Sequence, residues 1–110
     1  MGTSKMSYID AKYDLLINGD WVPAAGGETF ETFNPATGEK LADCANASPA
    51  DIDRAVEAAR AAFPAWSKTA PAERANLLLK VADLIEANAE RLAMAETLDN
   101  GKPIRETTLV

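Results

Sequence analysis

The chain of 110 residues has room for one domain, and its hydrophobic content of 47% is that of an ordinary soluble globular protein. Seventeen acidic against 11 basic residues give a net charge of -6, which argues against nucleic acids and anionic membranes as partners, because both require a basic surface. The absence of histidine and the single cysteine, Cys44, exclude an internal disulfide, the common His/Cys zinc sites and catalytic triads with a histidine base.

The first 14 residues mix polar side chains without a sustained period, and we expect residues 1–14 to form a flexible leader. The longest apolar run near the start covers residues 15–17 and is far shorter than a signal-peptide core or a membrane span. We therefore expect a cytoplasmic protein with no membrane partner and no nucleic-acid partner.

The first β-hairpin is predicted from the dipeptide Asn18-Gly19, which separates two β-prone runs at residues 15–17 and 20–22. Asn-Gly in this setting is the strongest short-range signal for a two-residue type I′ turn. Pro23 is expected to end the second arm.

A second hairpin is predicted from residues 29–33 and 41–46. The segment 34–39 joins them, and its Pro35 and Gly38 supply turn geometry. The first half of the chain is therefore expected to be rich in β-structure.

At Ser48 the period of the apolar residues changes from two to 3.6, which predicts a helix. Ser48 can cap this helix, Pro49 suits its first position, and Asp51 places a carboxylate in the positive first turn. Pro64 is expected to end it, because proline removes a hydrogen bond of the helix. One stripe of the helix carries Ile52, Ala55, Val56, Ala59 and Phe63.

Two further helices follow in the sequence. The first is predicted from a cap at Thr69 and from Pro71 in its first turn, and runs to about Asn88. The next covers about residues 89–99 and ends where Gly101 offers a left-handed cap. The earlier of the two has a broad apolar face, made by Leu77, Leu78, Val81, Leu84 and Ile85.

Residues 104–110 follow Pro103 and predict the opening of a fourth helix, inside which the chain ends. A domain of this length buries only about 60–70% of the surface of its unfolded chain, so it has little margin for unpaired apolar faces. Two antiparallel hairpins and three helices also cannot build a parallel sheet by themselves. We therefore expect chain beyond Val110, or a second copy, to cover these apolar helix faces. We also expect a homo-oligomer.

Five segments stand in a recognisable order: INGDWV at 17–22, FNPATGE at 33–39, DRAVEAARAAF at 53–63, ADLIE at 82–86 and ETLDNGKP at 96–103. Together they resemble the opening of the aldehyde dehydrogenase superfamily. The likeness covers about residues 15–110. Within it, the sequence of residues 99–107 most resembles bacterial members that act on acetaldehyde or other short aliphatic aldehydes.

The resemblance implies an α/β fold for the full-length protein, in which residues 15–110 are the incomplete N-terminal part of the cofactor-binding domain. The family oxidises an aldehyde to a carboxylic acid through a cysteine thioester and transfers a hydride to NAD or NADP. The residues for these steps lie later in the family's chain. We therefore expect no catalytic and no cofactor-binding residue here, no tight binding of NAD or NADP, and no activity from this chain alone.

The resemblance implies one site within the chain. In many family members a monovalent cation is held partly by the residue that matches Thr32 and by an aspartate that we expect just past Val110. Thr32 is thus a candidate cation ligand. The alternative is that Thr32 is a β-branched residue that suits a strand.

Other conspicuous residues are expected to be structural. Cys44 lies in an alternating strand and has no histidine or lysine beside it that would activate the thiol. Glu96 and Asp99 could pair as acid and base, but their spacing is also typical of a solvated helix end. Trp21 and Trp66 are interpreted as packing anchors, and the glycines form no G-x-G-x-x-G motif.

Two hypotheses about function remain open. In the first, the chain is the N-terminal part of an aldehyde dehydrogenase, which acts on its substrate only with the remainder of the enzyme. In the second, it is a stand-alone, non-catalytic interaction module that keeps the same fold and binds a partner through its uncovered helix faces. A chain that ends within a predicted helix favours the first.

Overall fold

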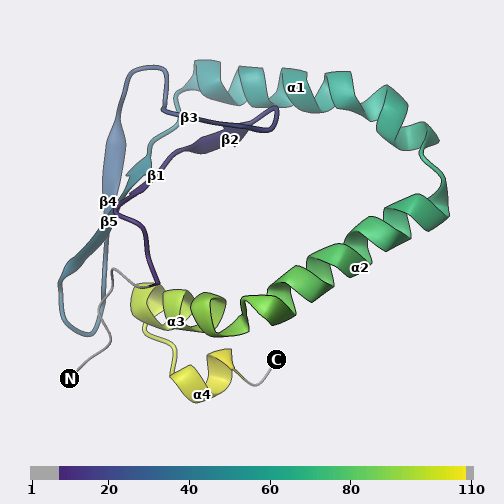
Figure 1. Cartoon of the computed structure of the whole chain (residues 1–110). Helices are drawn as coiled ribbons and strands as arrows, with labels where there is room; N and C mark the ends of the chain where they lie inside the picture. The colour runs from purple at the N-terminus through teal and green to yellow at the C-terminus, as the bar shows by residue number, and fades with distance from the viewer. Residues whose placement is uncertain (1–7, 109–110) are drawn as a thin grey trace.

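The computed structural model describes residues 8–108, in which five short strands are followed by four helices (Figure 1). The predicted order of two hairpins, three helices and the start of a fourth is confirmed. The strands are β1 (Lys12–Tyr13), β2 (Leu15–Ile17), β3 (Asp20–Val22), β4 (Thr29–Phe33) and β5 (Lys40–Ala45). The helices are α1 (Pro49–Lys68), α2 (Pro71–Ala87), α3 (Ala89–Asn100) and α4 (Ile104–Thr107).

The first hairpin joins β2 and β3 in antiparallel register. Asn18 and Gly19 have φ values of 53° and 83°, so both turn residues occupy the left-handed region that a type I′ turn requires. The predicted turn is therefore confirmed. Leu16 and Ile17 of the hairpin share one hollow with four small side chains of α1, namely Ala55, Ala58, Ala59 and Ala62.

The second sheet has the strand order β1-β5-β4, with β4 antiparallel and β1 parallel to β5. The predicted β4–β5 hairpin is confirmed. The parallel β1–β5 pair was not predicted, because the two residues of β1 are too few to leave a periodic signal. Strand β1 lies within the leader predicted over residues 1–14. The rest of that leader, residues 1–7, lies outside the described residues.

Helix α1 begins as predicted, since the Ser48 side chain accepts a hydrogen bond from the Asp51 N–H at 3.3 Å. The prediction that Pro64 ends the helix is wrong, because α1 continues to Lys68. Proline removes one helix hydrogen bond and bends the axis, and an exposed helix tolerates both effects because water can bind the freed carbonyl.

The prediction that Thr69 caps α2 is also wrong. The Thr69 hydroxyl donates back to the Ala65 carbonyl at 3.1 Å, and Ala70, which makes no side-chain cap, precedes the helix. Thr69 therefore closes the end of α1. At the end of α3 the prediction is confirmed, because Gly101 has the left-handed φ of 81° and its N–H donates to the Thr97 carbonyl.

The core of the described residues is small. Its hydrophobic members are Ile9, Ala24, Leu41, Ala42 and Ala93. The radius of gyration is 17.2 Å, whereas a compact chain of about 100 residues has about 13 Å. Figure 1 shows the reason, since α1 and α2 diverge from their junction and form two sides of an open frame. No helix among residues 8–108 has the length and apolar content needed to cross a membrane.

Candidate functional site

Thr32 and Asp99 are brought together from distant parts of the chain. The Thr32 hydroxyl on β4 donates a hydrogen bond to a carboxylate oxygen of Asp99 near the end of α3. The contact crosses 67 residues of sequence, so no local pattern could have predicted it. The carboxylate beside Thr32 thus belongs to the described chain, whereas the resemblance implies an aspartate beyond Val110.

The turn between β4 and β5 lies against the end of α3, next to this pair. Gly101 follows α3 directly, and a β-carbon added there would lie 3.1 Å from Cγ of Pro35 in the turn. The backbone of the α3 end therefore approaches the turn closely. A hydroxyl and a carboxylate are hard oxygen donors, the kind that alkali and alkaline-earth cations prefer. Among residues 8–108 no group of three or more acidic, cysteine or histidine side chains could hold a metal ion.

The other candidate side chains do not assemble into a reactive group. Glu96 accepts from the Asn100 amide at 3.4 Å, whereas Asp99 accepts from Thr32, so the two carboxylates have different partners. Cys44 occupies the predicted strand position, half-buried in β5 between β1 and β4, and forms no disulfide.

The interpretation of both tryptophans as packing anchors is wrong within this chain. Trp21 is 68% exposed and Trp66 is 49% exposed. An indole ring buries its large apolar surface where neighbours are available, so both rings mark places where this chain covers only part of the ring.

Asp51 is the one charged residue buried among those described, with 1% of its surface exposed. Its carboxylate accepts hydrogen bonds from the backbone N–H of Ser48 at 2.8 Å and of Ala25 at 3.1 Å, and it pairs with Arg54. The Ser48 N–H, then the Ala25 N–H and the Arg54 guanidinium, hold the pKa of Asp51 far below its usual range. The sequence predicted the cap, but not the tie to Ala25.

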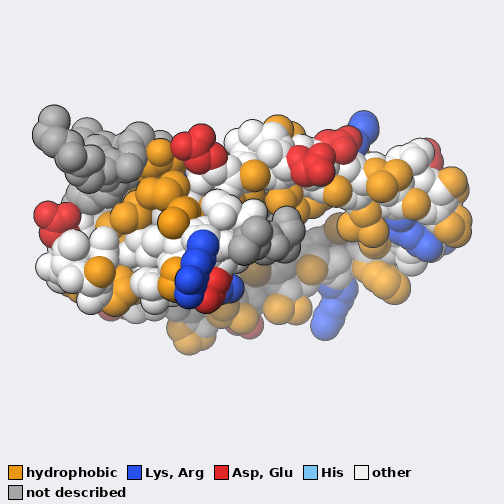
Figure 2. All heavy atoms as spheres, turned by 90° about the horizontal axis from the view of Figure 1, so that it is seen from below, with side chains coloured by type: hydrophobic (Ala, Val, Ile, Leu, Met, Phe, Trp, Pro, Cys, Tyr) orange, Lys and Arg blue, Asp and Glu red, His pale blue; other side chains and the backbone are white. Residues whose placement is uncertain are grey.

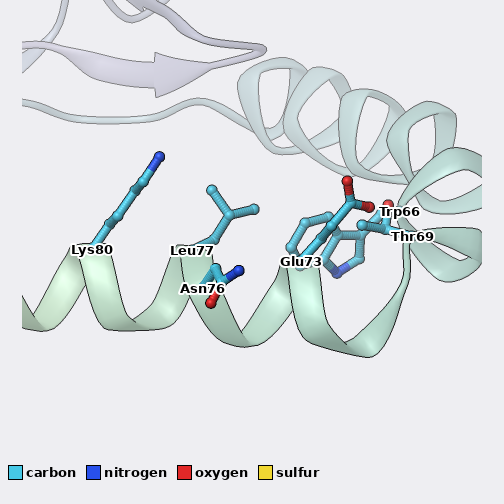
Figure 3. A pocket seen from close by; sticks show the side chains of 6 residues that line it. All are labelled: Trp66, Thr69, Glu73, Asn76, Leu77 and Lys80. Atoms are coloured by element: carbon cyan, nitrogen blue, oxygen red, sulfur yellow. The ribbon is translucent and has the colours of Figure 1, made fainter.

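Helix α2 is flanked by two shallow hollows. The first has a volume of about 400 Å³ and lies at the junction with α1, where Leu77 and Lys80 extend from α2 toward the side of α1 (Figure 3). Its lining residues are Trp66, Thr69, Glu73, Asn76, Leu77 and Lys80. The second, of about 410 Å³, lies farther along α2 and is lined by Val81, Leu84 and Ile85, by residues of α3, and by Tyr8 and Tyr13.

Comparison with known proteins gives a consistent result. The profile of the aldehyde dehydrogenase family matches residues 21–109. The chain is 50% identical over 97 residues to acetaldehyde dehydrogenase 2 of Cupriavidus necator, covering 88% of this chain and 19% of the relative. It is 47% identical over 96 residues to an aldehyde dehydrogenase of Deinococcus radiodurans, covering 87% and 19% of the two chains.

Among solved structures, the NAD+ complex of the aldehyde dehydrogenase from Bacillus cereus is similar, with a TM-score of 0.85 and 49% identity. The match covers 91% of this chain and 21% of that one. The chain thus spans about a fifth of the length of the relatives that it matches.

Proposed function

The chain belongs to the aldehyde dehydrogenase family, and from this premise we propose that residues 15–110 form the N-terminal part of the cofactor-binding domain of an NAD(P)-dependent aldehyde dehydrogenase. The observation that carries the proposal is the family match over residues 21–109. About half of the aligned residues are identical to those of relatives that are about five times as long as this chain. The likeness to the NAD+ complex from Bacillus cereus supports NAD as the cofactor of the complete enzyme.

The proposed reaction is oxidation of a short aliphatic aldehyde to its carboxylic acid through a cysteine thioester. The name of the Cupriavidus necator relative, acetaldehyde dehydrogenase 2, and the sequence DNGKPIRET at residues 99–107 both support acetaldehyde as a substrate. The cofactor, when bound, supplies the hydride acceptor. The part proposed for this chain is to complete the domain that positions the cofactor.

We assign the thioester chemistry and tight cofactor binding to the remainder of the dehydrogenase. Tight dinucleotide sites use backbone N–H groups at a helix N-terminus reached through a glycine-rich turn, and the glycines of this chain do not form that motif. Cys44, the one thiol of the chain, is held in the middle strand of a sheet. The partner of this chain is therefore the remainder of the enzyme.

The test compares the purified 110-residue chain with a mixture of this chain and the Cupriavidus necator enzyme lacking its first fifth. Acetaldehyde and NAD are supplied, and formation of NADH is followed by absorbance. Neither part alone is expected to turn over substrate, whereas the mixture is expected to do so. Turnover by the 110-residue chain alone that disappears on Cys44→Ala would refute the proposal.

Thr32 and Asp99 are proposed to hold a monovalent cation in the complete enzyme. The support is that a hydroxyl and a carboxylate meet between β4 and α3, and both are hard oxygen donors. A cytoplasmic location and a homo-oligomeric enzyme are proposed as well. The unpaired Cys44 is consistent with a reducing compartment.

The alternative, a self-contained interaction module, would use the same uncovered helix faces. It predicts a stable complex with a protein other than a dehydrogenase and no activity in the mixture described above. The length of the relatives favours the first proposal, because chains of this family carry these segments together with about four times as much sequence.

A further inference from the structure

The chain contains two Asn-Gly pairs, Asn18-Gly19 in the turn of the first hairpin and Asn100-Gly101 at the end of α3. Asparagine followed by glycine is the pair most prone to spontaneous deamidation, because glycine has no β-carbon to obstruct attack by its backbone nitrogen. We propose that Asn18 is a site of spontaneous deamidation and that the fold protects Asn100 from the same reaction. This modification is independent of the dehydrogenase reaction proposed above.

The reaction at Asn18 needs water as its only co-reactant. The backbone nitrogen of Gly19 attacks Cγ of Asn18, so that an N–Cγ bond forms and the Cγ–Nδ2 bond breaks. Nδ2 leaves as ammonia and takes the proton of the Gly19 N–H, which closes a succinimide ring. Water then adds its hydroxyl to one of the two ring carbonyl carbons, and the ring nitrogen takes back a proton. Opening at Cγ gives aspartate, whereas opening at the main-chain carbonyl carbon gives isoaspartate.

The peptide unit between Asn18 and Gly19 is free to rotate. Among residues 8–108, neither this peptide unit nor the Asn18 side chain has a hydrogen-bond partner. A β-carbon added at Gly19 would meet no atom within 4 Å. The turn stands at the tip of the β2–β3 hairpin (Figure 1) and borders the hollow of about 440 Å³ beside α1. The Gly19 nitrogen can therefore approach the amide carbon at the low cost of opening a hairpin tip.

The second pair is held by hydrogen bonds. The Gly101 N–H, whose nitrogen would attack, donates to the Thr97 carbonyl at 3.0 Å. The Asn100 side chain accepts from the Lys102 N–H at 2.8 Å, and Cγ of Pro35 would lie 3.1 Å from a β-carbon added at Gly101. Both asparagines are exposed, so access to water does not distinguish the two pairs. Ring closure at Asn100 therefore requires the end of α3 to open.

The two products affect the first hairpin differently. Aspartate keeps the turn, because Asp-Gly also favours type I′ geometry. Isoaspartate adds a methylene group to the main chain of a two-residue turn and so disturbs the register of β2 and β3. Leu16 and Ile17 then lose their place beside the alanines of α1. Hydrophobic side chains are already exposed along the length of the molecule (Figure 2), so a released hairpin enlarges that surface.

The test follows both asparagines in the same molecules. The dilute 110-residue chain is incubated at physiological temperature and mildly alkaline pH, in buffer and in guanidinium chloride. Trypsin then yields fragment 13–40, which contains Asn18, and fragment 92–105, which contains Asn100. Chromatography and fragmentation in a mass spectrometer measure aspartate and isoaspartate at each position. The variants Gly19→Ala and Asn18→Asp are treated in parallel.

In buffer, Asn18 is expected to deamidate about tenfold faster than Asn100 or more, because the end of α3 must open first. In guanidinium chloride the two rates should agree within about a factor of two, because unfolding removes that protection. Gly19→Ala should slow the reaction at Asn18 in both solvents. Equal rates in buffer, or a faster reaction at Asn100, would overturn the proposal. An Asn100 that stays slower in guanidinium chloride would also overturn it, because the sequence and not the fold would then cause the difference.

Thermal melts test the effect of the products on the hairpin. The aged natural chain, rich in isoaspartate, should melt at a lower temperature than the fresh chain. Fresh Asn18→Asp should melt as the fresh natural chain does, because it carries the product that keeps the turn. An isoaspartate-rich chain with an unchanged melting temperature would overturn the disturbance of β2 and β3.

Discussion

The Asp51 carboxylate accepts a hydrogen bond from the backbone N–H of Ala25, which lies 26 positions earlier in the chain. The same carboxylate accepts from the Ser48 N–H and pairs with Arg54. One side chain thus closes the start of α1 and ties it to the loop after β3. Its burial is tolerated because hydrogen bonds and a cation compensate the charge.

Ser48→Ala and Asp51→Ala are expected to destabilise the chain to different degrees. Ser48→Ala removes the acceptor for the first turn of α1 and should cost about 1 kcal/mol, a typical value for a helix N-cap. Asp51→Ala should cost more, because it also leaves the Ala25 and Ser48 N–H groups without their carboxylate. Urea denaturation followed by circular dichroism gives both values. Equal losses would show that the tie to Ala25 contributes nothing.

Acid should weaken the fold through Asp51. Its pKa in the folded chain lies below the ordinary value of 3.8, because the Ser48 N–H, the Ala25 N–H and Arg54 stabilise the ionised form. The resulting stabilisation is complete above the unfolded pKa and is lost as the pH falls below about 4 toward the folded pKa. Between about pH 5 and about pH 3, the urea midpoint should therefore fall more in the natural chain than in Asp51→Asn. Parallel losses in the two proteins would argue against this role.

Local signals in the sequence predicted the local parts of this fold. Asn18-Gly19, Ser48 and Gly101 each determine the backbone within a few residues of themselves, and all three behave as predicted. Pro64 is a local signal that failed, because an exposed helix tolerates a lost hydrogen bond where a buried one does not.

The long-range contacts could not be predicted in the same way. The Ala25–Asp51 and Thr32–Asp99 hydrogen bonds join segments whose separation is set by the whole chain, and polar residues at those positions also suit an exposed loop or helix end. The family resemblance pointed to Thr32 but not to Asp99. The packing role expected for Trp21 and Trp66 also failed, because a pattern does not say which part of a protein supplies the neighbour.

Gly101→Ala is expected to destabilise the end of α3 more than Gly38→Ala destabilises its turn. Both glycines have positive φ, 81° and 75°, so each alanine should cost about 1 kcal/mol in backbone strain. At Gly101 the new methyl group would also lie 3.1 Å from Cγ of Pro35, whereas nothing lies within 4 Å at Gly38. Thermal melts of the two variants measure the difference. A larger loss for Gly38→Ala would contradict the close approach of α3 to the turn.

Thr32→Val and Asp99→Asn should remove a specific effect of small monovalent cations. Sodium or potassium chloride is expected to raise the melting temperature of the complex with the truncated enzyme more than choline chloride does at the same ionic strength, because choline cannot be held by a hydroxyl and a carboxylate. In either variant the salts should act alike. Thr37→Val, in the nearby turn, is the control that should keep the natural response. A difference between salts that survives both substitutions would place the cation elsewhere.

Without the remainder of the enzyme, the 110-residue chain is expected to self-associate in a concentration-dependent way. Leu77, Leu78, Leu79 and Val81 are exposed on several sides of α2, and contiguous apolar patches of several hundred Å² seldom remain uncovered in soluble monomers. Contacts between copies cover one side at a time, so open-ended association is expected rather than one closed dimer. Added salt should promote it by screening the net charge of -6.

Size-exclusion chromatography with light scattering measures this association over a range of protein and salt concentrations. Val81→Asp should shift the distribution toward the monomer, because a charge on this exposed apolar face of α2 resists burial. Ala36→Asp, which adds the same charge in the turn between β4 and β5, should have little effect. The truncated dehydrogenase should also dissociate the oligomers, since it competes for the same apolar surface of α2. A cooperative monomer at high concentration that binds no truncated enzyme would mean that these residues close their own core, and would favour the self-contained interaction module.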